Sequence, residues 1–132
     1  MNSEIKSHKD LIVWQKGIDL SRAIYKLTGE FPQREVYALS SQMRRAAVSI
    51  PSNIAEGKAR RTAKDFVHFL HIAFGSAAEL ETQLLIAKQL SFVDENEYVT
   101  TNALISEVSK MLRAMIAKLE TSIWRLSASS RS

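Results

Sequence analysis

The sequence contains no cysteine and only two prolines and four glycines among its 132 residues. The absence of cysteine excludes disulfides, thiolate metal sites and a cysteine nucleophile. Strand and hairpin signals are also missing, because apolar and polar residues do not alternate. No apolar run approaches the roughly 18 residues of a membrane span, and the N-terminus has no signal-peptide core. We therefore expect one cytoplasmic domain with no membrane partner, in which residues 1–9 and 127–132 are flexible tails.

The positive charge of the chain is concentrated in one segment. The net charge is +4, and 34–65 carries seven basic side chains against three acidic ones, so the whole excess lies there. Such a cluster can attract phosphate groups, although a solvated helix end has the same composition. The candidate nucleic-acid-binding residues are Arg44, Arg45, Lys58, Arg60, Arg61 and Lys64.

Apolar residues recur at intervals of three and four in four segments, which predicts four amphipathic helices. Thr28-Gly29 is expected to end the first, and Thr62 with Asp65 and Asp94 with Glu97 to cap the third and fourth. Short connections favour antiparallel neighbours, so we expect an all-α, up-down antiparallel four-helix bundle. The stripes are Val13, Gly17, Leu20, Ile24 and Leu27; Leu39, Met43, Ala46, Ile50 and Ile54; Phe66, Leu70, Ala73, Ala77, Leu80, Leu84 and Ala87; and Tyr98, Ile105, Val108, Leu112, Met115, Leu119 and Leu126.

Pro51 lies inside the second stripe. A proline in a helix removes one backbone donor and costs about 3 kcal/mol, and the carbonyl of Ala47 then needs another partner. Ser49, Ser52, a neighbouring helix or water could supply it. We predict one helix, kinked near Pro51, that continues to about Gly57 or a little beyond; the alternative is two shorter helices divided at Ser49-Ile50.

A polar stripe runs beside the apolar one in the same segment and consists of Gln42, Arg45, Ser49, Asn53 and Glu56. Arg45 and Glu56 lie about 16 Å apart along a helix, so each is expected to meet a partner on another helix or subunit. The stripe either locks the register of the bundle through buried hydrogen bonds or faces a ligand.

The third helix carries more apolar surface than one core requires. This excess predicts a second buried interface between subunits, although a few scattered exposed apolar residues would also account for it. The candidate oligomer-interface residues are Phe69, Ile72, Phe74 and Ile86.

Signs of catalysis are weak. A di-iron bundle needs Glu-x-x-His motifs, and none occurs. His68 and His71 could bind a divalent metal only if a carboxylate joined them. A Gly-rich phosphate loop and a nucleophile elbow are also absent. We expect no enzyme, no cofactor and no metal site. Most of the main aromatic residues have core spacing, which favours packing over base stacking; the six are Trp14, Tyr25, Tyr37, Phe66, Phe69 and Phe74.

Several segments nevertheless match a known pattern, chiefly Ser-Ile-Pro-Ser-Asn-Ile-Ala-Glu-Gly at 49–57 and Gly-Ser-Ala-Ala-Glu-Leu-Glu-Thr-Gln at 75–83. The other matching pieces are 10–16, 31–32, 35–42, 44–48 and 69–74, and the resemblance spans about residues 10–120. In this order the chain resembles the 23S rRNA intervening-sequence proteins, whose genes often lie inside insertions in bacterial ribosomal RNA genes. Gly17 stands where alanine is expected in that family.

The resemblance implies an all-α bundle that assembles into a ring, a homopentamer. It also implies kinship with the accessory variability protein of diversity-generating retroelements, a basic pentamer that works with a reverse transcriptase and nucleic acid. It does not by itself imply any enzymatic activity. The resulting hypothesis is a non-enzymatic homo-oligomer that binds RNA or DNA phosphates through the basic cluster. The alternative is a protein–protein interaction scaffold whose basic cluster contacts other subunits or an acidic partner protein.

Overall fold

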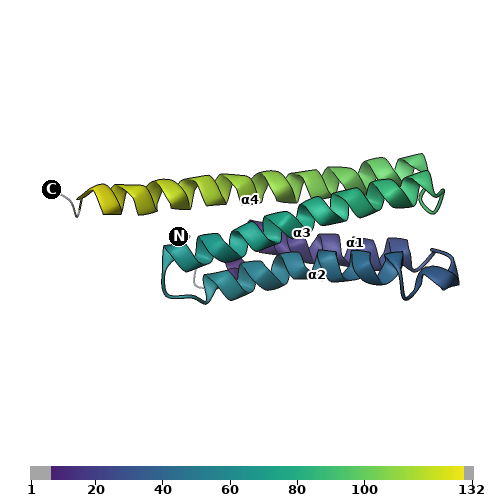
Figure 1. The fold of residues 1–132 in the computed structure, drawn as a ribbon, viewed down its shortest axis with the longest axis horizontal. Coiled ribbons are helices and arrows are strands. Elements are labelled where there is room, and N and C mark those ends of the chain that lie inside the picture. The colour runs from purple at the N-terminus through teal and green to yellow at the C-terminus, as the bar shows by residue number, and fades with distance from the viewer. Residues whose placement is uncertain (1–6, 130–132) are drawn as a thin grey trace.

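A computed structural model of the chain describes residues 7–129 and shows four α-helices preceded or joined by short 3₁₀ helices (Figure 1). The four long helices correspond to the four predicted stripes. The elements are η1 (His8–Asp10), α1 (Ile12–Thr28), η2 (Gln33–Glu35), α2 (Leu39–Lys58), α3 (Ala63–Gln89) and α4 (Glu95–Ser129).

The helices pack as a ring of neighbours. The backbones of α1 and α2, α2 and α3, α3 and α4, and α4 and α1 lie close together, whereas the backbones of the two diagonal pairs lie farther apart. Consecutive helices run antiparallel through short connections (Figure 1). The predicted up-down four-helix bundle is therefore confirmed.

The core is built from the predicted stripes. The largest fully buried side chains include Leu20 of α1, Met43 and Ile50 of α2, Leu80 of α3 and Leu112 of α4. Each of these lies on a stripe whose spacing places it on one face of its helix. The periodicity alone was thus enough to identify the buried face of every helix.

Two predicted helix starts are capped in the structure. Thr62 Oγ1 accepts a hydrogen bond from the Asp65 amide at 3.1 Å. Asp94 and Glu97 form a reciprocal box, because each carboxylate accepts from the other residue's amide, at 2.7 and 3.0 Å. These bonds satisfy amide groups that the first turn of a helix leaves unpaired.

The end of α3 uses a device that the sequence did not indicate. Ser91 has a φ of +64°, the left-handed conformation usually occupied by glycine. The amide of Ser91 bonds to the Lys88 carbonyl, and the amide of Phe92 bonds to the Ala87 carbonyl, both at 2.9 Å. This pair of bonds is a Schellman motif, which closes the helix without a glycine.

α2 is one continuous helix across Pro51, so the alternative of two shorter helices is wrong. The bend at Pro51 stays a prediction. Pro51 has no N–H group to donate to the carbonyl of Ala47. This carbonyl instead accepts a hydrogen bond from Ser21 Oγ of α1 at 3.2 Å. The neighbouring helix therefore supplies the missing partner. Gly17, one turn before Ser21, brings α1 close at this point, since a Cβ there would lie 3.3 Å from Pro51 Cβ.

Gly57 is required where α2 meets the start of α3. A Cβ on this buried residue would lie 2.8 Å from Phe69 Cβ and 2.9 Å from Phe66 Cδ1. Real side chains essentially never approach so closely, so any larger residue would push the two helices apart. The glycine at the end of the 49–57 motif is explained by this packing.

The structure corrects one assignment to the core. Phe66 is half-buried and packs against the core beside the buried Val67. Leu126 is 72% exposed because α4, at 35 residues, is longer than α3, at 27, and extends past the α2–α3 connection (Figure 1). A stripe continues along a helix whether or not another helix lies beside it.

The expected tails fall partly outside the described residues. Residues 8–9 lie in η1, which Ser7 caps, and 127–129 lie in the last turn of α4. The remainder, 1–6 and 130–132, is outside the part of the chain that the structure describes. Within that part, no helix combines the length and the apolar character that crossing a membrane requires.

Candidate nucleic-acid interface

The six candidate cations lie in two separate places on the surface. Arg44 and Arg45 lie in the second turn of α2, and the other four surround the α2–α3 connection. Fourteen residues separate Arg44 from Lys58, which is about 21 Å along a helix. The structure therefore divides the basic cluster into an Arg44–Arg45 pair and a connection group, the latter consisting of Lys58, Arg60, Arg61 and Lys64.

Within the connection group, one cation is neutralised. Arg60 forms an ion pair with Glu56 at 2.7 Å and lies 4.8 Å from the centre of the Phe69 ring. The prediction that Glu56 meets a partner on another helix or subunit is wrong, since its partner lies four residues later in the same segment. Arg61 and Lys64 are exposed, and no carboxylate of residues 7–129 pairs with either of them or with Lys58.

The Arg44–Arg45 pair is held differently. Arg44 Nε donates to Thr28 Oγ1 at 2.8 Å, and the guanidinium lies 4.8 Å from the centre of the Tyr25 ring. Thr28 Oγ1 in turn donates to the carbonyl of Ile24 at 2.7 Å, which fixes its lone pairs toward Arg44. Arg45 is exposed. Neither arginine has a carboxylate partner among the described residues, so both charges remain uncompensated.

The predicted polar stripe is divided between packing and exposure. Asn53 Nδ2 donates to the Ser49 carbonyl and to Ser49 Oγ, at 2.8 and 2.9 Å, and Ser49 Oγ lies 2.9 Å from Ser76 Oγ of α3. This middle part connects α2 to α3 and supports the register-locking interpretation. Gln42 and Arg45, at the other end of the stripe, face solvent.

The six aromatic residues named from the sequence differ in how far they are exposed. Trp14, Phe66, Phe69 and Phe74 are partly covered, which agrees with a packing role. Tyr37 is 96% exposed and Tyr25 is 49% exposed. For these two tyrosines, the prediction of core packing is wrong. Tyr37 lies in the connection before α2, outside every apolar stripe, and that position was the signal for its exposure.

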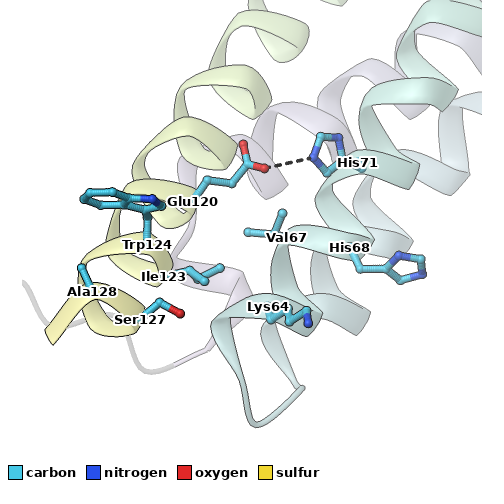
Figure 2. Close-up of a pocket in the computed structure, with 9 residues that line it drawn as sticks. All are labelled: Lys64, Val67, His68, His71, Glu120, Ile123, Trp124, Ser127 and Ala128. Atoms are coloured by element: carbon cyan, nitrogen blue, oxygen red, sulfur yellow. Dashed lines mark ion pairs between the residues drawn. The ribbon is translucent and has the colours of Figure 1, made fainter. Parts of the chain in front are cut away.

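The side chains of His68 and His71 on α3 point in different directions. His71 Nε2 lies 3.9 Å from Glu120 Oε2 of α4, whereas His68 turns away from this pair (Figure 2). Both belong to an open groove between the start of α3 and the extended end of α4, lined also by Trp124 and Ile123. In the described part of the chain, no three histidine, aspartate or glutamate side chains are grouped so that they could hold a metal ion.

Comparison with known proteins agrees with this fold. The family model described as 23S rRNA-intervening sequence protein matches residues 9–114, most of the chain. The chain belongs to this family. A crystal structure of a protein of unknown function from the S23 ribosomal protein family of Bacteroides thetaiotaomicron is similar, with a TM-score of 0.75 and 25% sequence identity over 80% of this chain and 96% of that one. A comparison with curated proteins gives no match.

In this family member, the two motifs that carried the resemblance contact each other. Ser49 opens the first motif and Ser76 belongs to the second, and their hydroxyl oxygens are 2.9 Å apart. Pro51 and Gly57 of the first motif pack against Gly17 and Phe69, respectively. The packing of α2 against its two neighbours therefore accounts for Ser49, Pro51 and Gly57 of the first motif and for Ser76 of the second.

The four candidate oligomer-interface residues are not equivalent. Phe74 is half-buried against the core and has Arg113 5.3 Å from its ring centre, and Phe69 is covered by Arg60. Ile72 and Ile86 are 40% and 43% exposed. They are fourteen residues apart on α3, an interval that returns to the same face of a helix. The interface stays a prediction, and these two isoleucines are its accessible residues.

Sequence reasoning missed Ser21 and Thr28, which support the Pro51 region and Arg44. Thr28 is sixteen residues from Arg44, and Ser21 is twenty-six from Ala47. Each looks like an ordinary helical hydroxyl in the sequence, because no local pattern marks a side chain whose partner lies on another helix.

Proposed function

We propose that this protein is a non-enzymatic, homo-oligomeric helical bundle that binds RNA or DNA through the phosphates. The observation that carries the proposal is the uncompensated charge on one segment. Of the six candidate cations, only Arg60 has a carboxylate partner among residues 7–129. Unpaired surface cations attract the phosphate backbone and release its counterions on binding, without any requirement for base sequence.

Assembly into an oligomer would strengthen nucleic-acid binding through the Arg44–Arg45 pair and the connection group. A pair of arginines and a group of three free cations give one subunit few phosphate contacts. In a ring, each further subunit adds its contacts at high effective concentration. The homopentameric state and the kinship with the retroelement accessory variability protein, both implied by the resemblance, are part of this proposal. The exposed Ile72 and Ile86 on one face of α3 support self-association.

The experiment is a titration of the purified protein into fluorescently labelled RNA at several salt concentrations. We expect binding at about 50 mM salt and a steep loss of affinity as salt increases, because each phosphate contact on a single strand contributes about −0.7 to the logarithmic slope. Absence of binding at the low salt concentration would overturn the proposal.

Arg60 and Arg61 allow a matched comparison, because Arg60 is paired with Glu56 and Arg61 has no carboxylate partner among residues 7–129. Arg61→Gln removes a free cation and should lower both the affinity and the salt slope. The double variant Glu56→Gln, Arg60→Gln removes an existing ion pair without changing the net charge, and it should bind as the wild type does. If reversal of Arg60 and Arg61 to glutamate breaks assembly or partner binding while RNA binding is unchanged, the scaffold alternative is favoured instead.

A further inference from the structure

Arg44 and Arg45 line a groove of about 620 Å³ beside α2. Its walls come from α1, from the connection before α2 and from α2 itself, and they include Tyr25, Tyr37 and both arginines. Serine hydroxyls, one amide and two valine side chains line the remainder, and no aspartate or glutamate is among the lining residues. The groove is therefore open and positive, with apolar as well as polar walls.

The two tyrosines give this groove a feature that the connection group does not have. Tyr37 makes almost no contact with the rest of the protein, since 96% of it is exposed. A bare aromatic ring beside two uncompensated cations can stack on the flat face of a nucleic-acid base while phosphates bind the cations. This combination of stacking surface and basic groove is typical of single-strand binding sites.

Arg44 is already positioned for such a ligand. Its Nε bond to Thr28 and its stacking over Tyr25 fix the plane of the guanidinium. Among residues 7–129, no hydrogen bond uses its two terminal amino groups, which can form a bidentate contact with phosphate. Because the side chain is held before binding, less conformational entropy is lost when the contact forms.

From this arrangement we infer that the groove binds a single-stranded segment of nucleic acid, with phosphates on Arg44 and Arg45 and an unpaired base stacked on Tyr37. The inference rests on the proposed function and narrows it from any phosphate backbone to a strand with free bases. A base within a duplex has no free face for Tyr37.

The experiment measures the affinity of the full-length protein for three labelled probes of equal length at about 50 mM salt: an oligouridine, the same backbone without bases, and a blunt RNA duplex. We expect the oligouridine to bind more tightly than either of the others. Tyr37→Ala should weaken oligouridine binding by about 5- to 150-fold and leave the abasic probe unchanged. Tyr37→Phe should retain the wild-type affinity, because the ring is what stacks.

Two further variants separate stacking from charge and from general surface effects. Arg45→Gln should weaken the oligouridine and the abasic probe alike. Trp124→Ala removes another aromatic side chain that is 71% exposed, at the far end of α4, and should change nothing. Circular dichroism checks that each variant is folded, and the exposure of Tyr37 makes a loss of folding unexpected.

The outcomes distinguish this inference from the proposed function. If none of the probes binds, the proposed function itself fails. If the oligouridine and the abasic probe bind equally and Tyr37→Ala has no effect, phosphate binding stands and the single-strand site is overturned. Tight binding of the duplex, or equal competition by an acidic peptide such as polyglutamate, would also overturn it.

Discussion

Ser21 Oγ of α1 lies 3.2 Å from the carbonyl oxygen of Ala47 of α2, the acceptor left without a helical donor by Pro51. The same hydroxyl lies 3.0 Å from the carbonyl of Gly17 in its own helix. A proline in the middle of a helix is therefore accommodated through a neighbouring helix. The close approach at Gly17 and the hydroxyl at Ser21 together make a helix-breaking residue part of the packing.

Ser21→Ala should lower the free energy of unfolding by about 1–2 kcal/mol, because the Ala47 carbonyl loses its partner in a partly buried place. Thr82→Ala is the matched control, since Thr82 Oγ1 bonds only to the Ala78 carbonyl of its own exposed helix face, at 3.0 Å. Urea denaturation of both variants tests this. Equal effects would show that the contact between helices contributes nothing.

Gly57→Ala should destabilise the protein by about 1–3 kcal/mol through overpacking against Phe66 and Phe69. The same change at Gly75 should stabilise it by up to about 1 kcal/mol, because alanine is the better helix former and a Cβ there meets nothing within 4 Å. Thermal unfolding of the two variants should therefore shift in opposite directions. A stabilised Gly57→Ala variant would contradict the geometry of the α2–α3 contact.

Ser91→Gly should raise the stability by about 1 kcal/mol, since glycine adopts a positive φ without the steric cost that serine bears. Ser109→Gly, in the middle of α4, should lower it because glycine is a poor helix former. Denaturant midpoints of the two variants provide the comparison. A loss of stability on Ser91→Gly would mean that the serine side chain has a role beyond closing α3.

Ile86→Glu should dissociate the proposed oligomer, because a charge placed on an apolar contact face must be desolvated without a partner. Val99→Glu is the control: Val99 is also exposed, at 54%, but lies on α4. Light scattering over a range of protein concentrations reports the mass of each. If Ile86→Glu and the wild type have the same mass, the α3 face is not the interface.

The fold was predictable because its information is local. The spacing of Leu20, Met43, Leu80 and Leu112 in their stripes shows which face of each helix is buried, and Asp94 with Glu97 marks a helix start. The assignment of Leu126 to the core was wrong for a physical reason: periodicity reports the face of a helix, and only a neighbouring helix decides whether that face is covered.

The candidate site was only partly predictable. The sequence by itself determined four amphipathic helices, their antiparallel order and the location of the excess positive charge, because these depend on residues a few positions apart. The tertiary structure decided that Thr28 of α1 holds Arg44, and that Tyr25 and Tyr37 line one groove together with both arginines. These properties depend on which side chains distant helices bring within a few ångströms of each other, and no local pattern encodes those distances.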